Sequence, residues 1–160
     1  MTTGTDHARL VALGAAWLRR QGFPIVATEL RCFGSREQPD VLGFRSNCSA
    51  MIEVKTSRGD FLADRRKPER AVGGLGLYRF YLCPEGLLQV ADLPSGWGLL
   101  VATGRGVTEV MRPRGNLWPP VGRAGGTEWE AFQHRPDLAA ERQALFSIAR
   151  RASAAPRGRR

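Results

Sequence analysis

Three charged side chains among residues 40–55 have the types and spacing to form one site, with two carboxylates and a lysine beside them. Asp40 follows Pro39 at the start of one apolar segment, and Glu53-Val54-Lys55 ends the next. Side chains alternate in direction along a strand, so Glu53 and Lys55 should emerge on the same face. If the two segments pair as a hairpin, Asp40 lies close to Glu53 on that face.

This arrangement could support hydrolysis of a phosphodiester. Two carboxylates and the backbone carbonyl of Val54 would make an all-oxygen site, which suits Mg²⁺ or Mn²⁺. Such an ion would lower the pKa of a bound water and neutralise charge on a phosphate. Lys55 could position that water and stabilise the transition state. Glu29, one segment earlier, could accept a proton, bind a second ion or hold a metal-bound water. We therefore predict Asp40, Glu53 and Val54 as metal ligands.

A solvated strand face would carry the same charges without any function. Asp, Glu and Lys are common, and this pattern should arise by chance in roughly one chain in ten to twenty of average composition. Glu53 and Lys55, however, interrupt an apolar strand, where charge is disfavoured unless a function or a partner needs it. The catalytic interpretation is therefore preferred.

The charge of the chain indicates a polyanionic partner. The 160 residues carry a formal net charge of +9, and all but two of the basic residues are arginines, the exceptions being Lys55 and Lys67. A GC-rich genome would also enrich arginine, but a basic domain is drawn to nucleic acid in either case. The segment after the motif supplies candidate phosphate contacts, which would otherwise form a solvated helix face with pairing to Asp64 and Glu69: Arg58, Arg65, Arg66, Lys67 and Arg70.

Other residue types exclude several classes of protein. The three cysteines are isolated and odd in number, and His7 and His134 are far apart, so neither a disulfide framework nor a zinc site is expected. No apolar run approaches the roughly 20 residues that cross a bilayer. The first residues lack a secretory pattern. We expect a cytoplasmic protein with no membrane partner.

The elements that must position the charged residues follow the order helix, three strands, helix, strand. Periodicity predicts a first helix over residues 6–21. A second helix follows Lys55, with Ser57 or Asp60 as its cap. Strands are predicted over residues 25–31, 40–45, 50–55 and 77–83, and further short strands over residues 87–90, 98–103 and 107–111.

The last third of the chain has a different composition. Residues 112–126 are rich in Pro, Gly and Arg and indicate a linker. Thr127 and Glu130 could form a capping box, and Asp137 could cap a helix to about Ala152, with Leu138, Leu145 and Ala149 on one side. Residues 153–160 are expected to be disordered. Three tryptophans could stack on bases, although packing in the core or linker is preferred for each: Trp97, Trp118 and Trp129.

The motif and its continuation resemble a known family. Glu29, Pro39-Asp40 and Glu53-Val54-Lys55 are similar to the signature of the PD-(D/E)xK nuclease superfamily, whose core is helix, three strands, helix, strand. Residues 56–61 with Asp64, Lys67 and Pro68-Glu69 resemble more specifically the MmcB-like DNA-repair nucleases. Residues 29–69 carry the resemblance well, and residues 5–83 carry it loosely. Gln38-Pro39 departs from it, because that family has a basic residue before the aspartate.

The resemblance implies an α/β (α+β) fold with a restriction-endonuclease-like core: a mixed β-sheet flanked by helices, with extra β-strands and a C-terminal helix. Residues 1–112 would be the nuclease-like domain, residues 113–152 a linker and the C-terminal helix, and residues 153–160 a basic tail. It implies a Mg²⁺- or Mn²⁺-dependent DNA endonuclease of repair, restriction or phage and mobile-element DNA processing, which could act as a homodimer. The alternatives are a non-catalytic nucleic-acid-binding module, or a phage regulatory protein that keeps the fold and binds an acidic protein.

Overall fold

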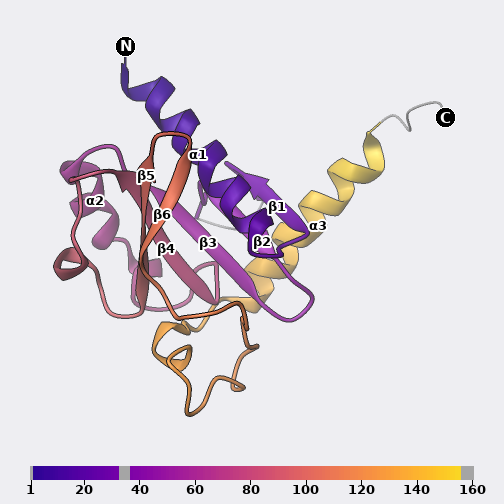
Figure 1. The fold of residues 1–160 in the computed structure, drawn as a ribbon. Coiled ribbons are helices and arrows are strands. Elements are labelled where there is room, and N and C mark those ends of the chain that lie inside the picture. The colour runs from indigo at the N-terminus through magenta and orange to yellow at the C-terminus, as the bar shows by residue number, and fades with distance from the viewer. Residues whose placement is uncertain (1, 33–36, 156–160) are drawn as a thin grey trace.

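The computed structural model describes residues 2–32 and 37–155 of the chain (Figure 1). The helices are α1 (Thr2–Arg20), α2 (Arg58–Arg65) and α3 (Leu138–Ala154), with short 3-10 turns η1 (Pro68–Arg70), η2 (Val90–Asp92) and η3 (Glu130–Phe132). The strands are β1 (Ile25–Thr28), β2 (Val41–Phe44), β3 (Ser49–Val54), β4 (Tyr78–Pro84), β5 (Trp97–Thr103) and β6 (Gly106–Met111). The predicted order of helix, three strands, helix and strand is confirmed.

Within the described residues, the six strands form one mixed sheet in which spatial order equals chain order. β1, β2 and β3 make an antiparallel meander. The chain then passes through α2 and returns as β4, which is parallel to β3. β5 is parallel to β4, and β6 returns antiparallel to β5. The predicted mixed sheet flanked by helices is confirmed, because α1 lies over one face and α2 and α3 lie over the other (Figure 1).

Alternation along the strands divides the core into two layers. Ile52 of β3 and Phe80 of β4 pack with Leu10 and Trp17 of α1. Met51 points the other way and packs with the residues around α2 and α3. The same alternation carries Glu53 and Lys55 to the α2 side of the sheet, which is the side on which polar contacts gather.

All three tryptophans that were candidates for base stacking are buried, so the preferred packing role is confirmed for Trp97, Trp118 and Trp129. Trp118 lies edge-on to Trp17, with ring centroids 6.2 Å apart. Trp118 and Ala124 therefore bring the segment predicted as a linker, residues 112–126, into the core beneath α1. The domain boundary at residue 112 stays a prediction.

Two local predictions are wrong. Residues 87–90 are not a strand, because the chain turns here and a reciprocal capping box between Gln89 and Asp92 begins η2 at Val90. Such local side-chain bonds compete with strand pairing. The expected capping box between Thr127 and Glu130 is also not formed, since the Thr127 hydroxyl donates instead to the Ala124 carbonyl, at 2.6 Å.

The cap of α3 is as predicted, but its rotation is not. Asp137 accepts a hydrogen bond from the Ala140 N–H, at 3.1 Å. Leu138 was expected on the apolar side, yet it is 68% exposed, whereas Ala144 is buried. Glu141 explains the difference: its Oε1 accepts from the Ser49 hydroxyl at 2.5 Å and from the Gly76 N–H at 2.9 Å. This anchor turns the other face of α3 to the sheet.

The ends of the chain limit two further predictions. α3 includes Ser153 and Ala154, which were expected in a disordered tail, and residues 156–160 lie outside the described residues. No helix in the described parts of the chain is long and apolar enough to cross a bilayer. The cytoplasmic location stays a prediction.

Candidate active site

The β2–β3 pairing places Asp40 beside the end of β3. Val41 is the partner of Ile52 in this antiparallel pair, so Asp40, one residue earlier, lies next to Glu53. Asp40 Oδ2 accepts a hydrogen bond from the Val54 N–H, at 2.8 Å. The hairpin argument from the sequence therefore leads to the observed neighbours. Because Asp40 binds a backbone group, the direction of its carboxylate is fixed.

Glu53 and Lys55 are buried on the α2 side of the sheet, with 3% and 7% of their surfaces exposed. Lys55 Nζ lies 3.6 Å from Glu53 Oε2. The other oxygen, Oε1, lies 3.2 Å from Arg70 Nη2. Burial raises the pKa of Glu53 to about 7; Arg70 opposes this rise and Asp40 adds to it. Glu53 can therefore exchange a proton near neutral pH.

Asp64 of α2 is a further carboxylate in the site, and it is only 1% exposed. Arg70 binds both of its oxygens, through Nη2 to Oδ1 at 2.8 Å and through Nε to Oδ2 at 2.9 Å. The Tyr81 hydroxyl donates to Oδ2 at 2.8 Å, and Lys55 Nζ is 3.3 Å from Oδ1. Burial opposes ionisation of Asp64, yet the bonds and charge of Arg70, followed by Lys55 and Tyr81, hold its pKa well below the usual range.

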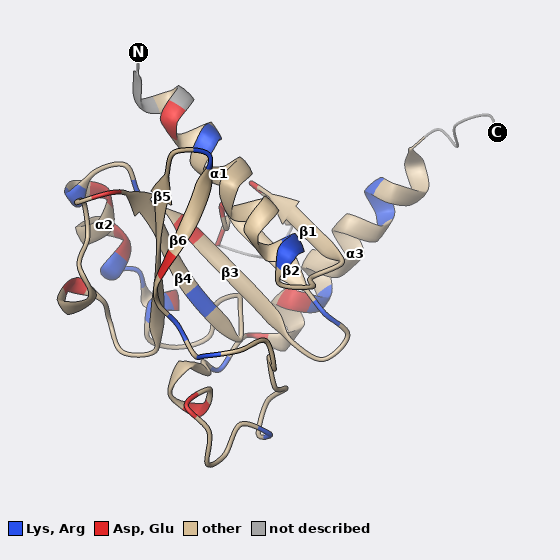
Figure 2. Ribbon diagram, in the orientation of Figure 1, with Lys and Arg blue, Asp and Glu red and all other residues tan. Residues whose placement is uncertain are grey.

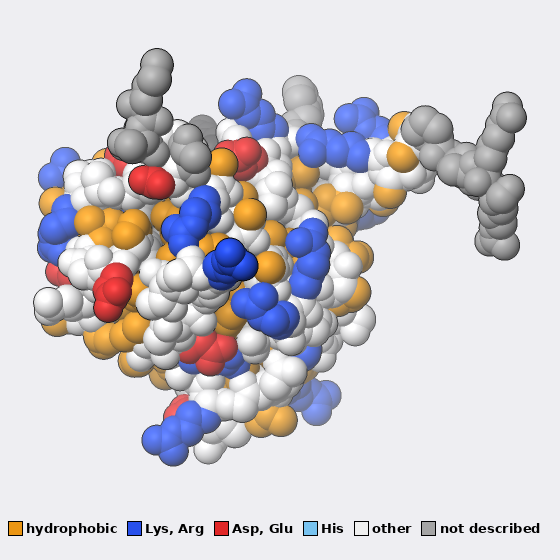
Figure 3. Space-filling view, turned by 45° about the horizontal axis from the view of Figure 1, so that its top comes forward, with side chains coloured by type: hydrophobic (Ala, Val, Ile, Leu, Met, Phe, Trp, Pro, Cys, Tyr) orange, Lys and Arg blue, Asp and Glu red, His pale blue; other side chains and the backbone are white. Residues whose placement is uncertain are grey.

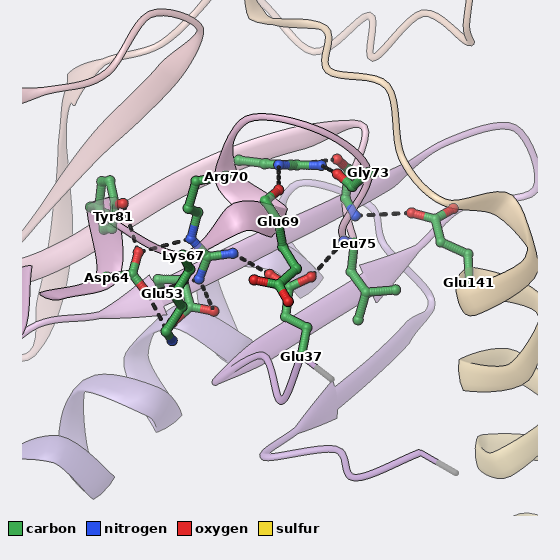
Figure 4. A network of polar contacts seen from close by, with 12 residues as sticks. Glu37, Glu53, Asp64, Lys67, Glu69, Arg70, Gly73, Leu75, Tyr81 and Glu141 are labelled. Atoms are coloured by element: carbon green, nitrogen blue, oxygen red, sulfur yellow. Dashed lines mark hydrogen bonds and ion pairs between the residues drawn. The ribbon is translucent and has the colours of Figure 1, made fainter. Parts of the chain in front are cut away.

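Arg70 connects this carboxylate to the chain before β2. Its Nη1 donates to Glu37 Oε1, and Glu37 Oε2 accepts from the Leu75 N–H at 2.7 Å. Figure 4 shows Arg70 between Asp64 on one side and Glu37 on the other. The side chain of Arg70 is 4% exposed. Arg70 was a candidate phosphate contact, and that prediction is wrong, because η1 turns it inward to balance three buried carboxylates. The alternative pairing with Asp64 is observed, although in the buried site and not on a solvated helix face.

His7 and Glu29 form the more exposed part of the site. His7 Nε2 lies 3.3 Å from Asp40 Oδ1 and 3.5 Å from Glu29 Oε1. Glu29 follows β1 with a φ of +47°, and its N–H donates to the Asp40 carbonyl at 2.9 Å. The structure thus brings together Glu29 and Asp40, as expected, and adds His7, which the sequence argument had set aside.

A signal for His7 was present in the sequence. The predicted apolar side of the first helix contains Leu10 and Trp17, and residues three or four apart share a side of a helix. His7, three residues before Leu10, continues that side by one turn. The side faces β1 and β2, so His7 had to lie near the start of β2, where Asp40 stands.

The cations expected to contact phosphate have different surroundings. Arg58 is held by Asp92 through two nitrogens, at 3.0 and 3.1 Å. The guanidinium of Arg65 lies over the Phe61 ring, 5.7 Å from its centroid. Arg65 and Arg66 are exposed, whereas the ammonium of Lys67 lies against Asp64. Only part of the predicted ridge is therefore directed to solvent.

The donor chemistry fits a hard divalent cation, with side-chain rearrangement. At the exposed end of the site, oxygens of Asp40 and Glu29 both lie within 3.5 Å of His7 Nε2, so an ion held by the two carboxylates would also require His7 to move aside. Glu53 could become a third ligand only if its carboxylate gave up its ion pairs with Arg70 and Lys55 and bound the metal ion instead. In residues 2–32 and 37–155, no group of three or more His, Cys, Asp or Glu side chains is gathered as in a metal centre. Asp40 and Glu29 carry the oxygen ligands that such an ion prefers, and they are the candidates to hold it.

Comparisons with known proteins show a similar fold in one solved structure and assign no activity. No family model and no curated protein matches the sequence. Among solved structures, the chain is similar to the SPO1766 protein of unknown function from Silicibacter pomeroyi, with a TM-score of 0.61 and 23% identity. The similarity covers 96% of this chain and 94% of that one. The two proteins therefore share a fold over nearly their whole lengths.

Proposed function

We propose that the protein is a metal-dependent DNA endonuclease that hydrolyses phosphodiester bonds in DNA repair, restriction or the processing of phage and mobile-element DNA. The observation that carries this proposal is the hydrogen bond from the Val54 N–H to Asp40. It joins Asp40 to the Glu53-Val54-Lys55 strand at one end of a core with the order helix, three strands, helix, strand. This is the arrangement that the resemblance to PD-(D/E)xK nucleases implies.

In this proposal, Lys55 supplies positive charge to the reacting phosphate. Its ammonium is held between Glu53 and Asp64, so its position is set before the substrate arrives. Fixed charge of this kind stabilises a transition state because no reorganisation is needed during the reaction. Asp40 and Glu29 would hold Mg²⁺ or Mn²⁺, which when bound supplies a more acidic water and neutralises phosphate charge. His7, whose Nε2 lies within 3.5 Å of both carboxylates, would take up a proton from the attacking water.

The surface charge supports DNA as the partner. The chain carries +9, and basic side chains are spread across the face seen in Figure 3. The outer turns of α3 add Arg150 and Arg151, both exposed, at the end that points away from the sheet (Figure 2). Contacts of this kind bind phosphates without reading bases.

One observation favours a second candidate, a non-catalytic nucleic-acid-binding module that keeps the fold. Both carboxylate oxygens of Glu53 already face cations of the protein, Lys55 and Arg70. A carboxylate paired in this way is balanced without a metal ion. The two candidates differ in one outcome, which is cleavage.

The deciding experiment incubates the purified full chain with supercoiled circular DNA and branched DNA in Mg²⁺, Mn²⁺ or EDTA. We expect nicking that needs the divalent ion and is lost in Asp40→Asn and Lys55→Ala. Arg123→Ala, which removes an exposed charge far along the chain, is the control and should cleave normally. Binding without cleavage in either metal would reject the nuclease and support the second candidate. Cleavage that persists in Asp40→Asn would reject the proposed site.

A further inference from the structure

The only two lysines of the chain meet at one oxygen atom. Lys55 Nζ lies 3.3 Å from Asp64 Oδ1, and Lys67 Nζ lies 3.1 Å from the same oxygen. Every other basic residue of the sequence, outside the histidines, is an arginine. The two ammonium groups come from different elements, the end of β3 and the chain after α2, and they can be no further apart than the sum of these two distances.

Asp64 is built to hold both ammonium groups in place. Its Oδ2 is bound by Arg70 Nε and by the Tyr81 hydroxyl, and this bonding fixes the plane and direction of the carboxylate. Oδ1 is left facing the lysines, with Arg70 Nη2 as its third neighbour. Since the pKa of Asp64 is held low by Arg70 first among its partners, the anchor remains negatively charged at neutral pH.

The two lysines differ in how far they reach solvent. The Lys55 side chain is 9% exposed and lies between two carboxylates, whereas the Lys67 side chain is 52% exposed. Within the described residues, Asp64 is the one partner of the Lys67 ammonium. An ammonium has three N–H donors, so Lys67 keeps donors that an incoming oxygen anion can use. A lysine also gives a compact charge that fits beside a single oxygen, unlike the broad fork of arginine.

Building on the proposed nuclease function, we propose that Lys67 is a second catalytic lysine, and that Asp64 is the positioning residue for both. The ammonium of Lys67 binds an oxygen of the scissile phosphate from the solvent side, next to the oxygen that Lys55 binds. As the water oxygen bonds to phosphorus, its proton passes to His7, and the ester bond breaks with its electron pair leaving on the ester oxygen. The negative charge on the phosphate oxygens is shared during this step by two fixed cations. Lys67 thereby acts inside the site and not as one more contact on the basic surface.

The test separates turnover from DNA binding. We would measure kcat on saturating circular DNA, and DNA affinity in EDTA, for Lys67→Ala, Arg66→Ala and Arg123→Ala. Arg66 is the exposed neighbour of Lys67, and its replacement removes the same charge without touching Asp64. We expect Lys67→Ala to lower kcat by about 10²-fold, as when one fixed transition-state donor is removed. Its loss of affinity should be no larger than that of Arg66→Ala, and Arg123→Ala should keep its kcat.

Asp64→Asn gives a second measurement. If it folds, it should lower kcat at least as much as Lys67→Ala, because both ammonium groups lose their anchor. If it does not fold, the surface variant Lys67→Ala still decides the matter. A wild type that cleaves DNA, with Lys67→Ala turning over like Arg66→Ala, would overturn this inference and leave the nuclease standing. A wild type that cleaves none of the DNA substrates would overturn both.

Discussion

Replacing Glu53 with Gln should change how the stability of the protein depends on pH. Between pH 5 and pH 8, the unfolding free energy of the variant should rise relative to that of the wild type. The pKa of Glu53 is raised from 4.5 to about 7, chiefly by burial. Below pH 4.5 both the folded and the unfolded chain keep this proton. Between about pH 4.5 and 7 the unfolded chain releases it first, so the stability contributed by the protonated carboxyl is lost as the pH rises.

The size of the effect follows from the pKa difference. One pKa unit corresponds to about 1.4 kcal/mol, so the full shift corresponds to about 3 kcal/mol. Glu53 is almost fully buried, so solvent screening reduces this figure little. The glutamine side chain of the variant cannot ionise, so the variant lacks this loss. The difference in unfolding free energy between variant and wild type should therefore grow by about 3 kcal/mol across this range.

The assay is urea unfolding of both proteins in EDTA at pH 5, 6, 7 and 8, because a metal ion would otherwise offset the charge. Subtracting the unfolding free energy of the wild type from that of the variant at each pH removes the contribution of distant titrating groups. Glu85→Gln, on an exposed turn, controls for the loss of one carboxylate. The difference in unfolding free energy between Glu53→Gln and wild type could instead stay constant or shrink as the pH rises. That result would show that Glu53 is ionised in the folded protein at low pH, and it would refute the reasoning.

Three further outcomes are expected. Arg70→Met should lower the unfolding free energy by roughly 3–5 kcal/mol in urea titrations at pH 7, because Glu37, Glu53 and Asp64 lose their shared buried cation; a loss below about 1 kcal/mol would contradict the network. DNA affinity should fall steeply with salt, with a slope in log K against log salt of close to one unit per phosphate neutralised, and a flat response would exclude phosphate binding. Truncation after Ala152 should leave the melting temperature unchanged within about two degrees, since residues 149–155 are exposed; a larger drop would mean that the tail is docked.

Local patterns in the sequence were enough to predict much of the fold. Alternation located β3, and short apolar segments located β2 and β4. The Ser57 hydroxyl does cap α2 by accepting from the Asp60 N–H. The proximity of Asp40 to the end of β3 followed from the shortness of the connection between the two strands. These features depend on residues that are near in sequence, where steric and hydrogen-bonding preferences are strong.

The rest of the candidate site depends on contacts that no local pattern encodes. Arg70 looked like one of several surface cations, and only the inward turn of η1 brings it to Glu37 and Glu53. His7 reaches Asp40 across 33 positions because α1 crosses β1 and β2. The rotation of α3 was likewise predicted wrongly, because one partly buried hydrogen bond from Ser49 to Glu141 outweighs the apolar stripe.

The burial of Trp118 has a consequence for synthesis of the chain on the ribosome. Each strand pairs with the strand made just before it, so the sheet can be completed in the order of translation, with no strand inserted later between two others. The layer beneath α1 is different. The rings of Trp17, Phe23, Tyr78 and Phe80 all pack on Trp118, which is made after the last strand. A nascent chain that has just finished β6 therefore has its sheet and α1 but lacks the ring that fills the layer between them, and this layer can be completed only when residue 118 has left the exit tunnel.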